Sequence, residues 1–530
     1  HCVRHSSTSY ISYFILSLIV VGRSETVKVV TRKGEIVGQK MDGYTAFFGI
    51  PYARVDDNNH FGESLQYPRF NTPFIANDTL TKCPQAWPLN VGGTIQCLCL
   101  NIYMPKTDKT KLPILVWFHG GGFVWGSANK YGGEHLVKHG IIVVTVNYRL
   151  GPYGFFCLDD PTVPGNQGLK DQISALKWIK QNINGFGGDA KKVTIAGASY
   201  GGGAVDLHLY SSYKRLFDKV IIQSGSMFSE GFFVKPNYVA AIKIANYLGH
   251  NVSITRDALK LLNKENPIDV MHAAMDLNLK LTACAEKRYK GVENFVFADP
   301  FHLNTTERLE STSIIIGYNS KEAFDVFVNK TKLFYNLIGN EFYNRITKNF
   351  HLEESEAIAV SDIVRNFYLG DKNIGPDAML ELSDFTSDIM INRAAEWSVN
   401  KYVDAGATVY KYLFSYIGGS EYQNISGAGA IHTEELKYLF ETDTKLETDK
   451  QMFIRDRMTT MWAQFVKFGN PTTDLTNLVP IIWEPVSGID RPYLDIDLEL
   501  NMDNFVYSER MAFWELFWQY YIELSAASAY

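Results

Sequence analysis

The chain has 530 residues, of which 46% are hydrophobic and 20% are charged, close to the averages of globular proteins. Lys and Arg total 51 and Asp and Glu total 57, so the formal net charge is −6. This mild acidity argues against a general nucleic-acid or anionic-membrane binder. Six cysteines are too few for a disulfide-dense scaffold. The composition therefore predicts a large globular core.

The N-terminus carries an apolar run from Tyr10 to Val21 that follows a basic residue. The run is shorter than the about 20 residues that cross a bilayer. A basic start, a short apolar stretch and small residues after it are typical of a secretory signal peptide. We therefore expect a signal peptide at residues 1–24, cleaved after Gly22 or Ser24; a buried strand or an interfacial helix is the alternative. No other stretch resembles a membrane span.

Secretion gives meaning to two further features of the sequence. Without Cys2 the mature chain has five cysteines, an odd number, so at least one thiol stays free or pairs with another chain. Five N-x-S/T sequons predict glycans on surface loops, at Asn77, Asn251, Asn304, Asn329 and Asn424.

Short apolar runs alternate with stretches of helical periodicity along the chain. Most of the runs are continuously apolar, which is typical of strands buried on both faces of a parallel sheet. The predicted strands are residues 112–118, 141–147, 193–196, 220–223, 314–317 and 409–414. Between them, residues 169–183 have apolar side chains at helical spacing. The alternation predicts an α/β fold, and the absence of a Pro-, Gly- or Ser-rich linker predicts a single domain over residues 25–530.

A G-x-S-x-G motif, Gly197 to Gly201, directly follows a predicted strand. In a nucleophile elbow this spacing lifts the serine above the sheet on a tight strand-to-helix turn, which needs small residues on both sides. The N-terminus of the following helix favours developing negative charge. The motif alone arises often by chance, but its position after a strand predicts that Ser199 is a nucleophile.

A second glycine-rich segment, His119-Gly120-Gly121-Gly122-Phe123, also follows a predicted strand. Three glycines let a backbone loop approach a ligand closely, with its N–H groups directed at an oxyanion. A flexible glycine turn is the alternative, but the elbow downstream favours the functional interpretation. The sequence has neither a complete G-x-G-x-x-G fingerprint nor a Walker A motif, so it gives no support for a nucleotide-dependent activity.

With these motifs the chain resembles the type-B carboxylesterase family (carboxylesterase/cholinesterase) of the α/β-hydrolase fold, from about Val27 to about Gln519. The overall pattern is similar to secreted insect esterases. Further landmarks of the resemblance are Phe48-Gly49-Ile50-Pro51, Asn147-Tyr148-Arg149, Gln223-Ser224-Gly225, Phe468-Gly469-Asn470-Pro471 and Trp483-Glu484-Pro485. The resemblance implies a large, mostly parallel central sheet flanked by helices.

The resemblance also implies a catalytic triad in the order Ser199, Glu322 and His432. Glu322 ends a G-x-N-x-x-E segment that begins at Gly317, and His432 lies in a G-x-x-H-x-x-E segment that begins at Gly429. Backbone N–H groups would hold the oxyanion of the reaction intermediate, and neighbouring residues would keep these groups and the triad in place. The implied oxyanion residues are Gly121, Gly122 and Tyr200, the supporting residues are His119, Gly120 and Ser224, and the implied disulfide joins Cys83 and Cys97.

The chain departs from the family at several positions. Ala198 and Tyr200 flank the serine where many members have Glu and Ala, and the Tyr200 ring is expected to narrow the pocket or redirect substrates. Ala323 follows the acid where the family has Gly. A family ion pair is absent, because its positions align with His60 and Ile95, whereas a second pair, Arg149 with Asp171, is retained.

The sequence thus predicts a secreted serine carboxylesterase that hydrolyses small to medium hydrophobic esters through an acyl-enzyme. Its partner is a small-molecule ester, such as an odorant or pheromone, xenobiotic or hormone ester, and not a nucleic acid. The protein is expected to be a monomer or homodimer without a metal or organic cofactor. One alternative is a non-catalytic adhesion or ligand-binding protein on the same fold, and another is a lipase.

Two other features are expected to be structural. His135 and His139 have the spacing of one helix face but lack the acidic partner of a metal motif. Residues 511–524 are aromatic at helical spacing and are expected to pack on the core, with a dimer helix or membrane contact as alternatives.

Overall fold

A computed structural model describes residues 25–86, 91–304, 307–350 and 352–527 of the chain. The predicted signal peptide at residues 1–24 lies outside the described residues. Within them, no helix has both the length and the apolar character needed to cross a membrane.

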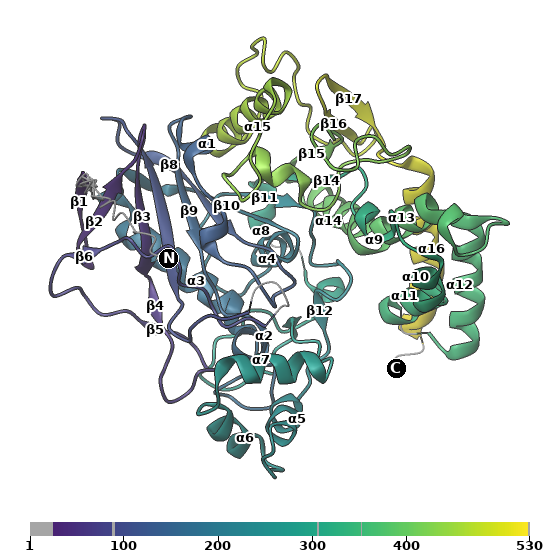
Figure 1. Cartoon of the computed structure of the whole chain (residues 1–530), viewed down its shortest axis with the longest axis horizontal. Helices are drawn as coiled ribbons and strands as arrows, with labels where there is room; N and C mark the ends of the chain where they lie inside the picture. Colours follow the sequence, from purple (N-terminus) through teal and green to yellow (C-terminus); the bar gives the residue numbers. More distant parts are fainter. Residues whose placement is uncertain (1–24, 87–90, 305–306, 351, 528–530) are drawn as a thin grey trace, which may run out of the picture.

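The described residues are built around one large twisted sheet (Figure 1). Its strands run parallel from β9 to β16, and antiparallel strands extend it at both ends. In spatial order they are β1 (Thr26–Thr31), β2 (Gly34–Lys40), β3 (Tyr44–Pro51), β7 (Cys99–Pro105), β9 (Ile142–Val146), β8 (Leu112–Phe118), β10 (Gly188–Ala198), β11 (Lys219–Gln223), β14 (Ser313–Asn319), β15 (Thr408–Phe414), β16 (Pro492–Ile496) and β17 (Leu500–Asn504). The short strand β6 (Phe74–Ile75) pairs with β2, whereas β4 (Ala53–Arg54) and β5 (Leu65–Gln66) form a separate two-stranded sheet.

All six predicted strands belong to the parallel part of this sheet, as β8, β9, β10, β11, β14 and β15. The predicted helix at residues 169–183 is α3 (Gln167–Asn182). Strand β10 starts at Gly188, five residues before the predicted start at Val193. The prediction missed this part because Asp189, Lys191 and Lys192 interrupt the apolar run and are not buried. The mostly parallel α/β sheet flanked by helices is therefore confirmed.

Alternate side chains of the central strands point to opposite faces, and both faces are buried. Val116 and Phe118 of β8 belong to the core on one face, whereas Leu115 and Trp117 belong to the core on the other. Burying one such aliphatic side chain stabilises a fold by about 1.5–3 kcal/mol. The first core includes residues of α3, α4 (Tyr200–His208) and α14 (Arg393–Asp404), and the second includes residues of α1 (Glu134–Val137) and α15 (Asp449–Phe468).

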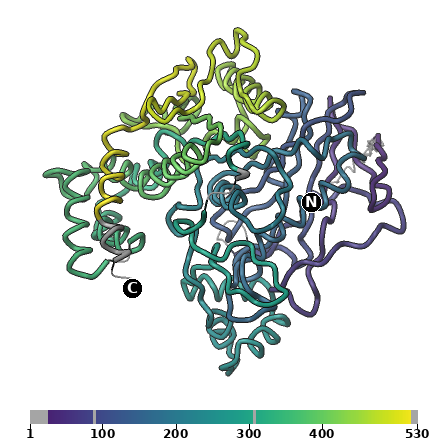
Figure 2. Tube along the Cα trace, turned by 180° about the vertical axis from the view of Figure 1, so that it is seen from behind, coloured from purple at the N-terminus to yellow at the C-terminus, as the bar shows by residue number. Residues whose placement is uncertain are grey.

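A group of helices forms a lobe with its own apolar core, away from strands β1 to β3 in both views (Figures 1 and 2). Its members are α10 (Lys332–Ile338), α11 (Glu341–Asn349), α12 (Glu354–Leu369), α13 (Met379–Ser387) and α16 (Ser508–Ala527). Helix α16 contains the predicted aromatic segment, and its Trp514 and Phe517 are buried in this core. Other helices are α2 (Gly151–Phe155), α5 (Ala240–Tyr247), α6 (Thr255–Leu262), α7 (Pro267–Asp276), α8 (Glu307–Glu310) and α9 (Phe324–Phe327).

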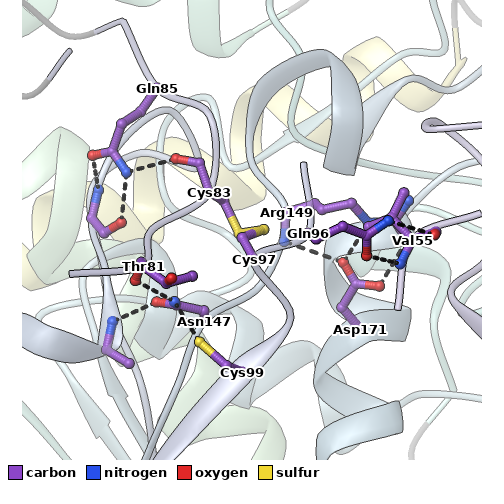
Figure 3. The surroundings of a disulfide bond; sticks show 12 residues. Val55, Thr81, Cys83, Gln85, Gln96, Cys97, Cys99, Asn147, Arg149 and Asp171 are labelled. Atoms are coloured by element: carbon purple, nitrogen blue, oxygen red, sulfur yellow. Dashed lines mark hydrogen bonds and ion pairs between the residues drawn. A yellow bond between two sulfur atoms is a disulfide. The ribbon is translucent and has the colours of Figure 1, made fainter. Parts of the chain in front are cut away.

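Two disulfides join cysteines of the described residues. Cys83 is joined to Cys97, the pair that the family resemblance implies (Figure 3). A second bond, between Cys157 and Cys284, had no counterpart in the sequence prediction, and it ties the segment after α2 to β13 (Ala283–Cys284), which pairs with β12 (Phe233–Val234). Cys99 is the remaining free thiol among the described cysteines. It is buried beside the amide of Asn147, and burial raises its pKa to about 12.

Candidate functional site

The predicted site residues follow the carboxyl ends of adjacent parallel strands. His119 follows β8, Ser199 follows β10, Ser224 follows β11 and Glu322 follows β14 after a short loop. His432 lies in the loop region after β15. Since the carboxyl ends of parallel strands meet at one edge of a sheet, this topology brings the segments to a common edge, where α/β proteins bind ligands.

Ser199 occupies a strained turn between β10 and α4. Its backbone has φ 54° and ψ −129°, a conformation that non-glycine residues rarely adopt. Glycine is required on both sides: a Cβ on Gly197 would lie 2.4 Å from the Gly201 carbonyl oxygen, and one on Gly201 would lie 2.2 Å from that of Phe118. Ser199 is partly exposed, whereas the strand before it is buried. The motif therefore forms the sharp strand-to-helix turn expected of a nucleophile elbow.

The glycine-rich loop lies directly against this turn. A Cβ on Gly120 would lie 2.7 Å from the Ala198 carbonyl oxygen and 3.0 Å from the Ser199 Cβ. Gly121 and Gly122 have φ values of +107° and +62°, which favour glycine. Within the described part of the chain, the N–H groups of these two glycines donate no hydrogen bond. They are thus free to bind an acceptor on a ligand.

His119 supports the glycine loop and stays neutral. Its buried ring stacks on Tyr148 with 4.4 Å between ring centroids, and its Nδ1 lies 2.8 Å from the Gly120 carbonyl oxygen. Burial lowers the pKa of His119 to about 4. A neutral ring can donate Nδ1–H to that carbonyl and so fix the peptide that enters the loop.

Glu322 and His432, 110 residues apart in the chain, are joined by two hydrogen bonds. The His432 Nδ1 lies 2.6 Å from Glu322 Oε2, and the His432 backbone N–H donates to the Glu322 carbonyl oxygen at 3.1 Å. The His432 side chain is 33% exposed, whereas that of Glu322 is 2% exposed. Burial acts to lower the pKa of His432, but the charge and hydrogen bond of Glu322 raise it above its usual value.

The other carboxylate oxygen of Glu322 is also held. Glu322 Oε1 accepts the Ser224 hydroxyl and the Asn319 backbone N–H, each at 2.6 Å. Ser224 connects the acid to the elbow, because the preceding residue, Gln223, accepts the Ser199 N–H at 2.9 Å. Side-chain hydrogen bonds therefore join Ser224, Glu322 and His432, and Ser199 is linked to them through its backbone N–H and Gln223.

A second buried carboxyl, Glu435, lies beside this network, and the sequence prediction gave it no role. It accepts the side-chain amides of Asn319 at 2.6 Å and of Gln223 at 2.9 Å. Burial, and then the charge of Glu322, raise its pKa to about 7. The only signal in the sequence was that Glu435 ends the histidine motif and Asn319 lies within the acid motif.

Tyr200 turns its side chain into a group of aromatic rings. Its ring centroid lies 5.2 Å from that of Phe123 and 5.4 Å from that of Phe232, both at steep angles. The hydroxyl donates to the Glu230 carbonyl oxygen at 3.2 Å. The backbone N–H of Tyr200 remains at the first turn of α4, so the departure from Ala at this position leaves the main-chain donor in place.

Two other sequence features are resolved by the structure. Arg149 and Asp171 form the retained ion pair, with two N–O distances of 2.7 Å (Figure 3). Arg149 also donates to the His60 carbonyl oxygen. His135 and His139 do not share a helix face, because α1 ends at Val137. His135 pairs with Glu441 and His139 with Thr459, and no cluster of metal-ligand side chains occurs among the described residues.

Comparison with known proteins places this geometry in a family. The sequence model of the Carboxylesterase family matches residues 25–514. Esterase FE4 of Myzus persicae is 30% identical over 89% of this chain and 89% of its own length. Juvenile hormone esterase of Tribolium castaneum is 28% identical over 84% of each chain. Pyrethroid hydrolase Ces2e of Rattus norvegicus is 28% identical over 80% of this chain and 74% of its own length.

The family match covers the sheet, the elbow, the glycine loop and the segments of Glu322 and His432. By their names, two of these relatives are esterases and the third is a hydrolase. The protein belongs to the carboxylesterase family and is a carboxylic-ester hydrolase of the α/β-hydrolase fold.

Proposed function

We propose that the protein is a secreted serine carboxylesterase that hydrolyses small to medium hydrophobic esters, with Ser199 as nucleophile, His432 as base and Glu322 as acid. The observation that carries this proposal is the 2.6 Å hydrogen bond between His432 Nδ1 and Glu322 Oε2, at the sheet edge where Ser199 sits on its strained turn. Each of these residues also lies in the sequence motif expected for its role.

In the proposed reaction His432 Nε2 takes the proton of the Ser199 hydroxyl as the oxygen attacks the ester carbonyl carbon. The N–H groups of Gly121, Gly122 and Tyr200 stabilise the resulting oxyanion; one such donor contributes about 3 kcal/mol in comparable sites. The histidinium then gives its proton to the departing alcohol. Water, activated by the same base, releases the acid from the acyl-enzyme.

The remaining residues support this reaction by holding others. His119 and Gly120 fix the start of the oxyanion loop, through the Nδ1 contact and the close approach to Ser199. Ser224 holds the inner oxygen of Glu322, so that the outer oxygen faces His432. A fixed carboxylate keeps the imidazole in the tautomer that leaves Nε2 free to accept a proton.

Secretion and glycosylation are part of the proposal. All five sequon asparagines are exposed, as glycan attachment requires. Two disulfides suit an oxidising compartment. We expect the protein in the medium of secreting cells, with an N-terminus near residue 23 or 25, and a loss of mass on treatment with an N-glycosidase. An uncleaved N-terminus and an unchanged mass would contradict these two proposals.

The substrate class is proposed from the site and the relatives together. One relative is named for juvenile hormone and another for pyrethroids. The rings of Phe123, Tyr200 and Phe232 place an aromatic group next to the elbow. Apolar surroundings of this kind favour hydrophobic acyl or alcohol groups. Odorant or pheromone, xenobiotic and hormone esters are the classes that fit.

The test is hydrolysis of nitrophenyl esters, from acetyl to decanoyl, by the secreted protein and by Ser199→Ala. We expect activity that is lost in the variant, with a chain-length optimum that reports the size of the acyl pocket. Undiminished activity in folded Ser199→Ala would refute the nucleophile. A preference for long-chain emulsions over soluble esters would point to a lipase instead.

A further inference from the structure

The loop that carries Glu322 is attached to helix α13 on both sides of the acid. Before it, Lys321 Nζ lies 2.6 Å from Asp384 Oδ1. After it, the Ala323 backbone N–H donates to Ser387 Oγ at 3.0 Å. Both partners belong to α13, an element of the helical lobe outside the central sheet.

The two attachment points lie on one face of the helix. Asp384 and Ser387 are three residues apart, a spacing that places side chains next to each other on a helix surface. Ser387 is 1% exposed, and its hydroxyl donates to the Ser383 carbonyl oxygen at 2.7 Å. Its oxygen therefore has a fixed orientation in which it accepts the Ala323 N–H.

The beginning of α16 strengthens the same attachment. Arg510 Nη1 lies 2.9 Å from Asp384 Oδ1, the oxygen that binds Lys321. The Tyr507 hydroxyl donates to the Ser320 carbonyl oxygen at 2.7 Å. Lys321 and Arg510 thus share the carboxylate of Asp384. The acid loop is held through three of its groups: the Ser320 carbonyl, the Lys321 ammonium and the Ala323 N–H.

We propose that Asp384 and Ser387 are positioning residues, which hold the acid loop so that Glu322 keeps its hydrogen bond to His432. The inference rests on the proposed function of Glu322. Loops place catalytic groups less exactly than helices and strands do, and supporting contacts must hold such groups within about 0.5 Å. A shift of this loop would also move His432, because the His432 N–H donates to the Glu322 carbonyl oxygen.

The chain offers a matched pair of variants for the test. Ser387→Ala removes the acceptor of the Ala323 N–H. Ser383→Ala makes the same chemical change on the same helix, at a residue that is 0% exposed and whose hydroxyl has no hydrogen-bond partner among the described residues. The two variants differ chiefly in the contact to the acid loop.

With nitrophenyl butyrate we expect Ser387→Ala to lower kcat about tenfold, or about 1.4 kcal/mol of activation free energy, with KM within about twofold of the parent. Ser383→Ala should stay within about twofold in both constants. The acid limb of the kcat/KM profile should move to lower pH in Ser387→Ala only, because a displaced Glu322 raises the pKa of His432 less. Equal kcat and equal pH profiles in the two variants would overturn the proposal.

A double-mutant cycle covers the case in which Ser387→Ala does not fold. Lys321→Met and Asp384→Asn each break the first attachment, so the double variant should lose no more kcat than the worse single variant. If the fold losses in kcat of the two single variants multiply in the double variant, the proposed attachment through Lys321 and Asp384 is wrong. Glu322→Gln distinguishes failure of the proposed triad from failure of the positioning role. If Glu322→Gln keeps kcat, the proposed triad is wrong. If Glu322→Gln loses kcat while the attachment variants keep it, only the positioning role is wrong.

Discussion

Replacement of Glu322 by glutamine is a sharp test of the triad, because the structure fixes how the new side chain would sit. Glu322 Oε1 accepts the Ser224 hydroxyl and the Asn319 N–H at 2.6 Å each. The Asn319 backbone N–H can only donate, so a glutamine NH₂ group at the position of Oε1 would face another donor. The carboxamide oxygen therefore takes the inner position, and its NH₂ faces His432 Nδ1.

This orientation selects the wrong form of the base. An NH₂ donor opposite Nδ1 requires Nδ1 to be the acceptor, which moves the imidazole proton to Nε2. That nitrogen must be unprotonated to take the Ser199 proton. The same substitution in a serine protease triad, from carboxylate to carboxamide, lowers kcat about 10⁴-fold. We expect a similar loss here, equal to about 5 kcal/mol of activation free energy.

The measurement is kcat for nitrophenyl butyrate at pH 8, with thermal unfolding to show that the variant is folded. Glu434→Gln is the matched control: it lies two residues after His432, its carboxylate pairs with Lys437, and it should change kcat by less than about threefold. A loss below about tenfold in Glu322→Gln would refute the tautomer argument. An equal loss in the control would show that any nearby charge has the same effect.

Three further outcomes follow from the structure. The base must be neutral, so kcat/KM should be highest above the pKa of His432 and should fall as the pH drops through that pKa. Since the neighbouring carboxylate raises this pKa, the midpoint of the acid limb in a pH–rate series should lie above about 6.5. Arg149→Met leaves Asp171 buried at 0% exposure without its partner and should lower the free energy of unfolding by about 3–5 kcal/mol in denaturant titrations, while an unchanged midpoint would contradict a required pair. Gly201→Ala places a Cβ 2.2 Å from a β8 carbonyl oxygen and should abolish soluble active enzyme, whereas Gly488→Ala, with nothing within 4 Å, should be silent in the same expression and activity assay.

The central sheet was predictable because its strands carry a strong local signal. Strands such as β9 are buried along their whole length, so the sequence is continuously apolar there. The first part of β10 was missed because residues 189–192 are intermediate or exposed and carry no such signal. Pairing with a neighbouring strand, rather than an apolar sequence, defines the start of β10, since Gly188 pairs with Leu112 of β8.

The residues of the candidate site were predictable for a different reason. Ser199 lies in a short motif directly after a predicted strand, whereas Glu322 and His432 lie in short motifs that only the family resemblance identifies. The Cys157–Cys284 bond and the contacts of Ser387 depend instead on how distant segments pack. Cys157 and Cys284 are 127 residues apart, and neither lies in a recognisable motif. Periodicity and motif spacing carry no information about such pairs.

The departures at the elbow are tolerated because the turn is specified by backbone contacts. Ser199 keeps its strained φ of 54° while close approaches surround it: a Cβ on Gly225 would lie 2.0 Å from the Ser199 carbonyl oxygen. Such strain persists only where neighbouring structure fixes it. Ala198 and Tyr200 direct their side chains away from these contacts, Ala198 into the core on one face of the sheet and Tyr200 against the core on the other. Variation at Tyr200, whose ring packs beside Phe123 and Phe232, can therefore alter the aromatic group next to the elbow while the nucleophile keeps its geometry.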